Sequence, residues 1–425
     1  MQSLNLENFP DIELPKFLKI KQNFSMQKVE NVKQELLNKV TGKLIGLEGK
    51  RIAIGVGSRG ISNIDLITKT LIYALKKAGA IPFIVPAMGS HGGATSEGQL
   101  AILSSLNVKP ETMEVEFDAS MDVEKIGYVD DIPVYFSSSA LRADFIIIIA
   151  RIKPHTCFRG EVESGICKML TIGLGKQIGA SSLHSLGYNR FAEIIPKAAS
   201  VVVSKAPILF AVGIIENAYD EIFKLEIVER NEIPLIEREA HLLRESRQVM
   251  GKIILDEFDV LVIDEIGKEI SGDGQDPNVT GLYNTKNISS TNCFQKSVAF
   301  DLTEQSHGNA CGVGAVDIIT RTLFDKIDFV KTYANTFTSR ELGAAKIPMV
   351  AATKEDALRI AVKTCRGNNT ELQKIVWIKN TLKLGEIIVS ESLLSEVKKN
   401  PQLEILTEAQ KIKFNHGEPE FPWRF

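Results

Sequence analysis

Three side chains with catalytic potential follow apolar runs of strand length in this sequence. Arg59 lies in a Gly-Ser-Arg-Gly turn, His91 in a Gly-Ser-His-Gly-Gly loop, and His155 directly after Lys153 and Pro154. Imidazole exchanges protons near neutral pH, because its unperturbed pKa is about 6.5. A guanidinium can hold a carboxylate through two parallel hydrogen bonds. The set predicts acid/base chemistry on a carboxylate-bearing small molecule.

Each of these residues also has a purely structural interpretation. His91 and His155 could hydrogen-bond to backbone at a loop or a strand end, and Arg59 could be a surface residue of a turn. Two histidines at equivalent strand ends favour function over coincidence. In open α/β sheets, ligands bind beyond the carboxyl ends of the strands, where all three residues are expected.

The segment from Gly160 to Gly187 is rich in glycine, which suits a close approach of backbone to a ligand. We single out Gly165, Gly173 and Gly175 as candidate cofactor-binding positions. Lys168 stands among apolar neighbours, so burial could make its amine nucleophilic, although a lysine that reaches out to solvent is the alternative.

Two nucleotide-binding motifs are matched only in part. Gly55 to Gly60 has the G-x-G-x-x-G spacing, but no Asp or Glu occurs from Ile72 to Ser96, where a ribose-binding acid is expected. Gly-Leu-Gly-Lys ends at Lys176 and is followed by Gln177 instead of Ser or Thr. Ordinary NAD binding and a Walker phosphate loop are therefore disfavoured.

Strand-length apolar runs alternate with helix-period segments from Arg51 onward, which predicts an α/β fold with largely parallel sheets. The length of 425 residues favours more than one domain. We predict an N-terminal α/β domain at 1–248 with the acid/base residues, a C-terminal α/β domain at 249–425, and an active-site cleft between them. The charged helix predicted at 237–250 would connect the two domains.

Composition and charge narrow the class of protein. The net charge of −3 argues against a general nucleic-acid binder. The five cysteines never form C-x-x-C, so neither a disulfide framework nor a structural zinc site is indicated. The first residues lack the pattern of a signal peptide, and no apolar run reaches bilayer-spanning length. A cytoplasmic protein without membrane partners is expected.

With these residues identified, the sequence resembles the nickel-pincer-dependent lactate racemase family. The resemblance covers most of the chain and is strongest from Gly55 to Gly187. It rests on the order and spacing of the arginine turn, the two histidine loops, Lys168 in its glycine-rich segment, and His184 farther along. The stretch from Asp264 to Lys268 resembles the corresponding part of the second domain.

The resemblance implies a role for each of these residues. Lys168 would carry the covalently attached nickel-pincer nucleotide, a pyridinium-3,5-bisthiocarboxylic acid mononucleotide, and His184 would bind its nickel. His91 and His155 would be the acid/base pair. The residues implied to bind the substrate carboxylate are Arg59 and Lys268, with Glu265 nearby.

The activity implied is racemisation or epimerisation of a 2-hydroxy acid by reversible hydride transfer to that cofactor. Val56, Gly57 and Ser58 depart from the family's acidic-His-Thr sequence before the arginine, so lactate is not fixed as the substrate. The partners implied are the small-molecule substrate and the enzymes that make the cofactor. A homo-oligomer is left open.

Two alternatives remain at this stage. A zinc- or iron-dependent hydrolase would need His91, His155 and His184 to converge on one ion, at about 2.0 to 2.2 Å for zinc. A non-catalytic binding protein for small carboxylates would need neither Lys168 nor the whole histidine set.

Overall fold

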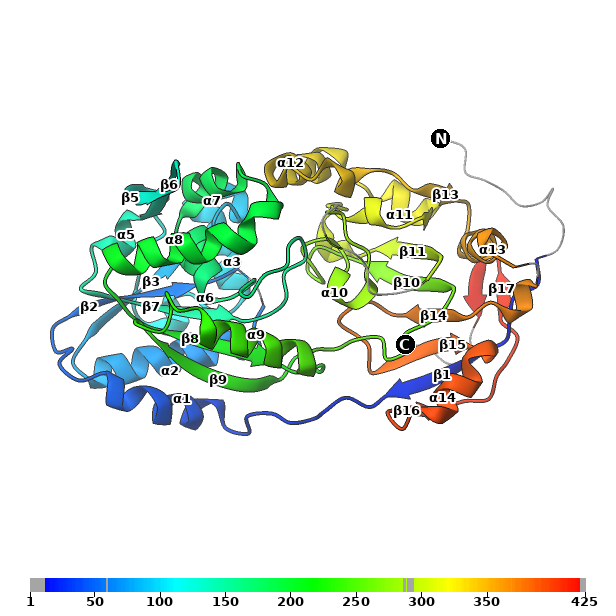
Figure 1. Cartoon of the computed structure of the whole chain (residues 1–425), viewed down its shortest axis with the longest axis horizontal. Helices are drawn as coiled ribbons and strands as arrows, with labels where there is room; N and C mark the ends of the chain where they lie inside the picture. Colours follow the sequence, from blue (N-terminus) through cyan, green and yellow to red (C-terminus); the bar gives the residue numbers. More distant parts are fainter. Residues whose placement is uncertain (1–11, 59, 286–287, 289–293, 368, 421–425) are drawn as a thin grey trace. The chain divides into compact units, whose positions relative to one another are not determined.

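The computed structural model describes residues 12–58, 60–285, 288, 294–367 and 369–420, and divides into two compact units (Figure 1). One unit is Met26–Met250. The other combines the N-terminal stretch that ends at Ser25 with Gly251–Phe425. Both units contain a mostly parallel sheet with helices, which confirms the predicted α/β class.

The sheet of the unit Met26–Met250 has six strands, parallel except for its last strand, which runs antiparallel to its neighbour. In spatial order they are β4 (Glu116–Phe117), β3 (Ile81–Pro86), β2 (Arg51–Val56), β7 (Phe145–Arg151), β8 (Ile208–Glu216) and β9 (Ile222–Glu229).

Helices cover both faces of this sheet, as the unbroken apolar run in β7 predicts. Ile147 and Ile149 face a core shared with α1 (Val32–Val40) and α2 (Ile64–Lys77). Ile146 and Ile148 face the opposite core, which α8 (Phe191–Lys205) and α9 (Glu237–Val249) complete. The strands are therefore fixed between two apolar layers, and their ends can carry polar loops.

Shorter elements of this unit complete the connections between the strands. They are α3 (Ser96–Ser105), α4 (Pro110–Met113), the hairpin of β5 (Val123–Val129) and β6 (Ile132–Ser137), α5 (Ser138–Leu141), α6 (Ile166–Lys168), the π-helical turn η3 (Met169–Gly173) and α7 (Lys176–His184), with 3₁₀ turns η1 (Thr41–Lys43), η2 (Gly92–Ala94) and η4 (Tyr188–Arg190).

The other unit is built on an eight-stranded mixed sheet. Its strands β13, β12, β11, β10 and β14 run parallel, and β15, β1 and β16 continue the sheet antiparallel. The strands are β13 (Met349–Ala351), β12 (Ile318–Thr320), β11 (Lys296–Leu302), β10 (Val260–Ile266), β14 (Ile375–Ile378), β15 (Glu386–Ser390), β1 (Phe17–Gln22) and β16 (Leu403–Ile405).

Its helices are α10 (Pro277–Thr280), α11 (Arg321–Asp325), α12 (Phe329–Ser339), α13 (Lys354–Thr364) and α14 (Leu394–Lys399), with short turns η5 (Glu304–Ser306), η6 (Val313–Ala315), η7 (Leu342–Ala345), η8 (Thr370–Leu372) and η9 (Glu391–Leu393). A separate hairpin pairs β17 (Lys413–Asn415) with β18 (Glu418–Glu420). Phe300, Trp377 and buried residues of α13 form the core against one face of the sheet.

The predicted division of the chain is wrong for β1. The sequence predicts one domain at 1–248 and the other at 249–425, yet β1 pairs with β15 and β16 in the C-terminal unit. The physical reason is burial, since Phe17 and Ile20 are fully enclosed there. Because the strands that pair with β1 lie far along the chain, the local sequence around β1 does not indicate which unit it belongs to.

Phe17 tests this assignment. Phe17→Ala should destabilise the C-terminal unit by about 3–5 kcal/mol, because a fully buried ring beside Trp377 is lost. Urea unfolding followed by tryptophan fluorescence measures the change, since both tryptophans, Trp377 and Trp423, belong to this unit by sequence. Phe337→Ala is the matched control, because that ring is 80% exposed. Equal effects of the two substitutions would contradict the assignment.

Candidate functional site

Parallel strands β3, β2 and β7 are neighbours in the sheet, so their carboxyl ends share one edge. Ser58 follows β2, His91 follows β3 and His155 follows β7. Arg59, the predicted carboxylate-binding residue, lies outside the described residues. The edge therefore presents both predicted acid/base histidines.

The His91 loop is held by hydrogen bonds from two sides. The Nδ1 atom of His91 lies 2.5 Å from the Oγ of Ser58, which connects the ends of β3 and β2. The amide of Gln99, on α3, donates to the carbonyl oxygen of Gly89 at 2.9 Å. His91 itself is exposed, which suits a residue that exchanges protons with a bound molecule.

Lys168 and His184 lie on a broken helix. Lys168 ends α6, the π-helical turn η3 follows it, and α7 ends at His184. Single π turns inside helices are frequent at functional sites, because they displace the side chains that follow from regular helical positions.

This broken helix packs closely on the ends of β2 and β3. The backbone N–H of Gly89 donates to the carbonyl oxygen of Gly173 at 3.0 Å. If Gly57 carried a side chain, its Cβ atom would lie 3.1 Å from the Cε of Met169, the residue after Lys168. The packing brings the Lys168 segment to the loops of Ser58 and His91.

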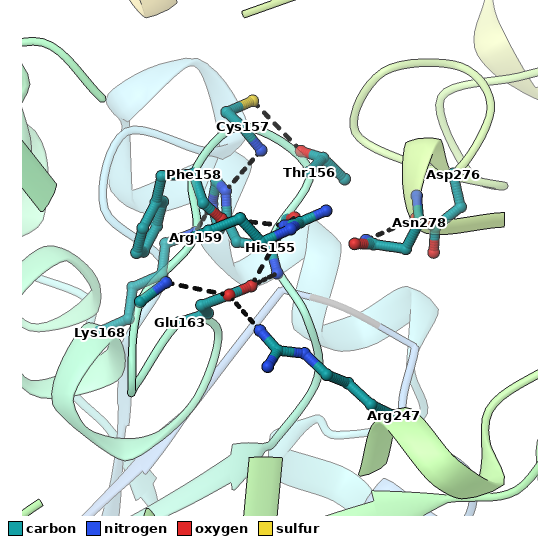
Figure 2. Close-up of polar contacts among 11 residues, drawn as sticks. His155, Thr156, Cys157, Phe158, Arg159, Glu163, Lys168, Arg247, Asp276 and Asn278 are labelled. Carbon is teal, nitrogen blue, oxygen red and sulfur yellow. Dashed lines mark hydrogen bonds and ion pairs between the residues drawn. The ribbon is translucent and has the colours of Figure 1, made fainter. Parts of the chain in front are cut away.

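His155 contacts Lys168 directly (Figure 2). The Nζ of Lys168 and the Nε2 of His155 are 2.5 Å apart. The ring of Tyr188 contacts both His155 and His184, with centroid distances of 5.9 Å and 5.3 Å. Lys168, His155 and His184 thus lie around one aromatic cluster.

Two further rings complete this cluster. Phe158 lies 4.6 Å from the ring of His155, and Phe191 lies 4.9 Å from that of His184, measured between centroids. Phe158 and Phe191 meet each other edge to face at 5.4 Å. Phe158, Phe191 and His155 are buried, whereas Lys168 and His184 are partly exposed at the edge of this cluster.

The three candidate glycines each have a close protein neighbour. A Cβ atom would lie 2.1 Å from the Oε1 of Glu239 at Gly165, 2.8 Å from the carbonyl oxygen of Ala87 at Gly173, and 2.2 Å from that of Thr171 at Gly175. Packing therefore explains the need for glycine at these positions. A cofactor-binding role for them stays a prediction.

Lys176 is a notable residue that the sequence did not reveal as part of the site. It is fully buried and has a φ of 53°, in the left-handed region that non-glycine residues rarely adopt. Its Nζ donates to the carbonyl oxygen of Pro86 at 2.8 Å and to the Oε1 of Gln99 at 3.3 Å. Burial lowers the pKa of Lys176 to about 8. Through Gln99, this lysine supports the His91 loop.

Glu239, on α9, is a buried carboxyl group behind the lysine-bearing helix. It is 2% exposed and accepts the backbone N–H of Cys167 at 3.0 Å. Burial raises the pKa of Glu239, and burial beside Glu239 raises the pKa of the Cys167 thiol. Burial therefore disfavours the charged form of both groups.

The other two predicted substrate-binding residues lie in the C-terminal unit. Lys268 donates from Nζ to the carbonyl oxygen of Gly272 and to the Oδ1 of Asn335. Glu265, on β10, accepts from the side-chain amide of Asn380 at 2.8 Å and pairs with Lys379 at 3.2 Å. Glu265 therefore has a cationic partner within its own unit.

The described residues contain neither a metal-ligand group nor a membrane-spanning helix. Within the described ranges, no three His, Cys, Asp or Glu side chains gather into a group that could hold a metal ion. The hydrolase alternative requires such a group. Four buried cysteines of the described chain form no disulfide with one another, namely Cys157, Cys167, Cys311 and Cys365, while Cys293 lies outside the described residues. No helix of the described chain is long and apolar enough to cross a bilayer.

No protein-family model matches the sequence, and no curated protein matches it significantly. Among solved structures, the chain is similar to the lactate racemase apoprotein from Thermoanaerobacterium thermosaccharolyticum, with a TM-score of 0.51. The match covers 89% of this chain and 96% of that chain, at 15% sequence identity. At this identity the likeness is one of fold.

Lys176 gives a prediction for the pH dependence of stability. Its folded pKa of about 8 lies below the ordinary 10.5, so the unfolded chain binds more protons between these values and stability should rise there with pH. The full difference corresponds to about 3 kcal/mol. Lys176→Met should remove this rise, as measured by urea unfolding and circular dichroism from pH 7 to 10. The exposed Lys205→Met is the control, and an unchanged slope in Lys176→Met would disprove the assignment.

Proposed function

We propose that this chain is a racemase or epimerase of a 2-hydroxy acid that works with a nickel-pincer nucleotide attached to Lys168. The contact between the Nζ of Lys168 and the Nε2 of His155, at 2.5 Å, is the observation that supports it most. It places an amine that can form a covalent bond beside an imidazole that can exchange a proton. The similarity of fold to a lactate racemase apoprotein adds support.

The side chains of this region fit the group that the proposal requires. One amine is needed for attachment and one imidazole for nickel, and Lys168 and His184 lie around the same aromatic cluster. Imidazole nitrogen is a suitable nickel ligand. The proposal asks for a single protein ligand to the metal, unlike the three-histidine hydrolase.

When bound, the nucleotide would supply a reversible acceptor for the hydride of the substrate C2, which avoids a carbanion. The chain's own residues handle the proton of the 2-hydroxyl group. One histidine of the pair His91 and His155 takes that proton as the planar 2-keto acid forms, and the other returns one on the opposite side. Two proton-exchanging groups are what production of the mirror image requires.

Binding of the substrate carboxylate is assigned in the same proposal to Arg59 and Lys268, with Glu265 as their neighbour. The pairing of Glu265 with Lys379 reduces its repulsion of an anionic substrate. The proposal also includes a cytoplasmic location and the need for cofactor-making enzymes as loading partners. Lactate and larger 2-hydroxy acids are the compounds to screen.

Loading of the protein is the first test. After expression together with the enzymes that make the cofactor, intact-mass and metal analysis should show a cofactor-sized adduct and nickel. Lys168→Ala should lack both, because the attachment atom is gone. Lys205→Ala, at the exposed end of α8, is the control and should keep the adduct. An unmodified wild-type protein, alongside a loaded control racemase, would refute the proposal and favour a binding protein without this cofactor.

The reaction itself is tested with isotope. A single enantiomer of a 2-hydroxy acid deuterated at C2 should give the opposite enantiomer with deuterium still at C2, because that hydrogen does not pass through water. Chiral chromatography with mass detection measures both outcomes, and Lys168→Ala should convert nothing. Deuterium lost to the solvent would instead indicate proton abstraction by a base, and would contradict the proposed chemistry.

A further inference from the structure

Glu163 is a fully buried carboxylate that lies after His155 and before Lys168 in the sequence. Its side chain has 0% exposure. Its Oε2 accepts the backbone N–H of His155 at 2.6 Å, and its Oε1 accepts that of Gly160 at 3.1 Å. Both oxygens are thus occupied by the loop that carries His155.

Two guanidinium groups balance the buried charge. Arg159 lies 3.3 Å from the Oε2 of Glu163, and Arg247, on α9, forms a close ion pair with the Oε1 (Figure 2). A buried carboxylate is tolerated when it is paired and hydrogen-bonded in this way. The carboxylate and Arg247 together anchor the His155 loop to a helix of the surrounding core.

The same set fixes the backbone of His155 at both polar atoms. While Glu163 holds the N–H group, Arg159 donates to the His155 carbonyl oxygen at 2.6 Å. With the backbone held, the imidazole turns back on its own loop, and the N–H of Cys157 donates to its Nδ1 at 3.0 Å.

This last hydrogen bond determines which nitrogen carries the proton. A backbone N–H can only donate, so the Nδ1 atom that accepts from Cys157 has no proton. Neutral His155 must then carry its proton on Nε2, the atom that faces the Nζ of Lys168, so this contact is a hydrogen bond only with Lys168 as a neutral amine, the form that covalent attachment of a cofactor also requires. His155 therefore begins as a hydrogen-bond donor, whereas His91 contacts a hydroxyl group that can donate or accept.

We propose that Glu163 and its partner Arg247 are positioning residues that hold His155 in its Nε2–H tautomer, directed at Lys168. The catalytic meaning of this arrangement rests on the proposed function, since it makes the two histidines of the acid/base pair inequivalent. The arrangement itself is a property of the unloaded protein and can be measured without cofactor or substrate.

The test is nitrogen NMR of histidine side chains in unloaded, ¹⁵N-histidine-labelled protein. The chain has six histidines, so the spectrum is simple, and His155→Gln identifies the signal of His155 by its absence. In the wild type, the Nε2 of His155 should be protonated and Nδ1 should not. In Glu163→Gln the signals should move toward an average of both tautomers, because the loop loses its charged anchor.

Glu193→Gln is the matched control. Glu193 also pairs with two cations, Arg190 and Lys197, but on the exposed surface of α8. Its substitution should leave the His155 signal unchanged. Arg247→Gln is the second test variant, for the case that Glu163→Gln fails to fold, because the Arg247 side chain is 41% exposed and Arg159 still balances the carboxylate. It should shift the tautomer signal in the same direction.

Wild-type His155 with its proton on Nδ1, or folded Glu163→Gln and Arg247→Gln proteins with unchanged tautomers, would overturn the positioning role. In loaded enzyme, Glu163→Gln should lower kcat by about 10-fold to 100-fold with little change in KM. If the tautomer responds but loaded wild type racemises no 2-hydroxy acid, the proposed function fails and the positioning role stands. If loaded wild type is active and the His155 tautomer does not change in the variants, the proposed function stands and the positioning role fails.

Discussion

The site depends on one close approach, between the π-helical turn after Lys168 and the loop after β3. Gly173 and Gly89 meet backbone to backbone, and a side chain at Gly173 would collide with the carbonyl oxygen of Ala87. Glycine has no Cβ, so only this residue type allows the two segments to come so near. Because of this contact, an amine on a broken helix and an imidazole on a strand-end loop belong to one region.

A second constraint lies beneath that contact, in the buried amine of Lys176. The residue combines a left-handed backbone with a solvent-excluded side chain, and both features lower stability. Such a residue persists only where its surroundings determine it strongly. Its hydrogen bonds to Pro86 and Gln99 tie the start of α7 to the end of β3 and to α3. At Lys176 the fold is less stable than it could be, but the position of the helix that ends at His184 is fixed relative to the loop of His91.

The sequence predicted the parts of the molecule that follow local rules. The unbroken isoleucines of Phe145–Arg151 predict strand β7, and of the two candidate caps of α3, Thr95 and Ser96, it is Thr95 that takes the position. Ser62, with Asp65 three residues farther on, is the cap that the sequence predicts for α2, but Asn63 takes the cap position and the Ser62 N–H instead donates to Glu216, on β8. The sequence predicts one helix near Gly314 to Phe324, but this segment ends η6, forms β12 and begins α11, because Ile318 and Ile319 pair in a parallel ladder with β11 and β13. Partners distant in the sequence decided both cases.

The same limit explains which site residues were missed. Histidines and a lysine are visible by type, but Glu163 looked like one of several acids in a polar stretch, and Arg247 like one charge on the exposed face of a predicted connecting helix. Their roles exist only after folding places them together. Helix α9 supplies Arg247 for the His155 loop and, two turns earlier, Glu239 for the segment of Lys168. One helix thus helps to position His155 through Glu163 and the segment of Lys168 through Glu239, and the sequence pattern of a charged amphipathic helix cannot separate such anchors from solvent-facing charge.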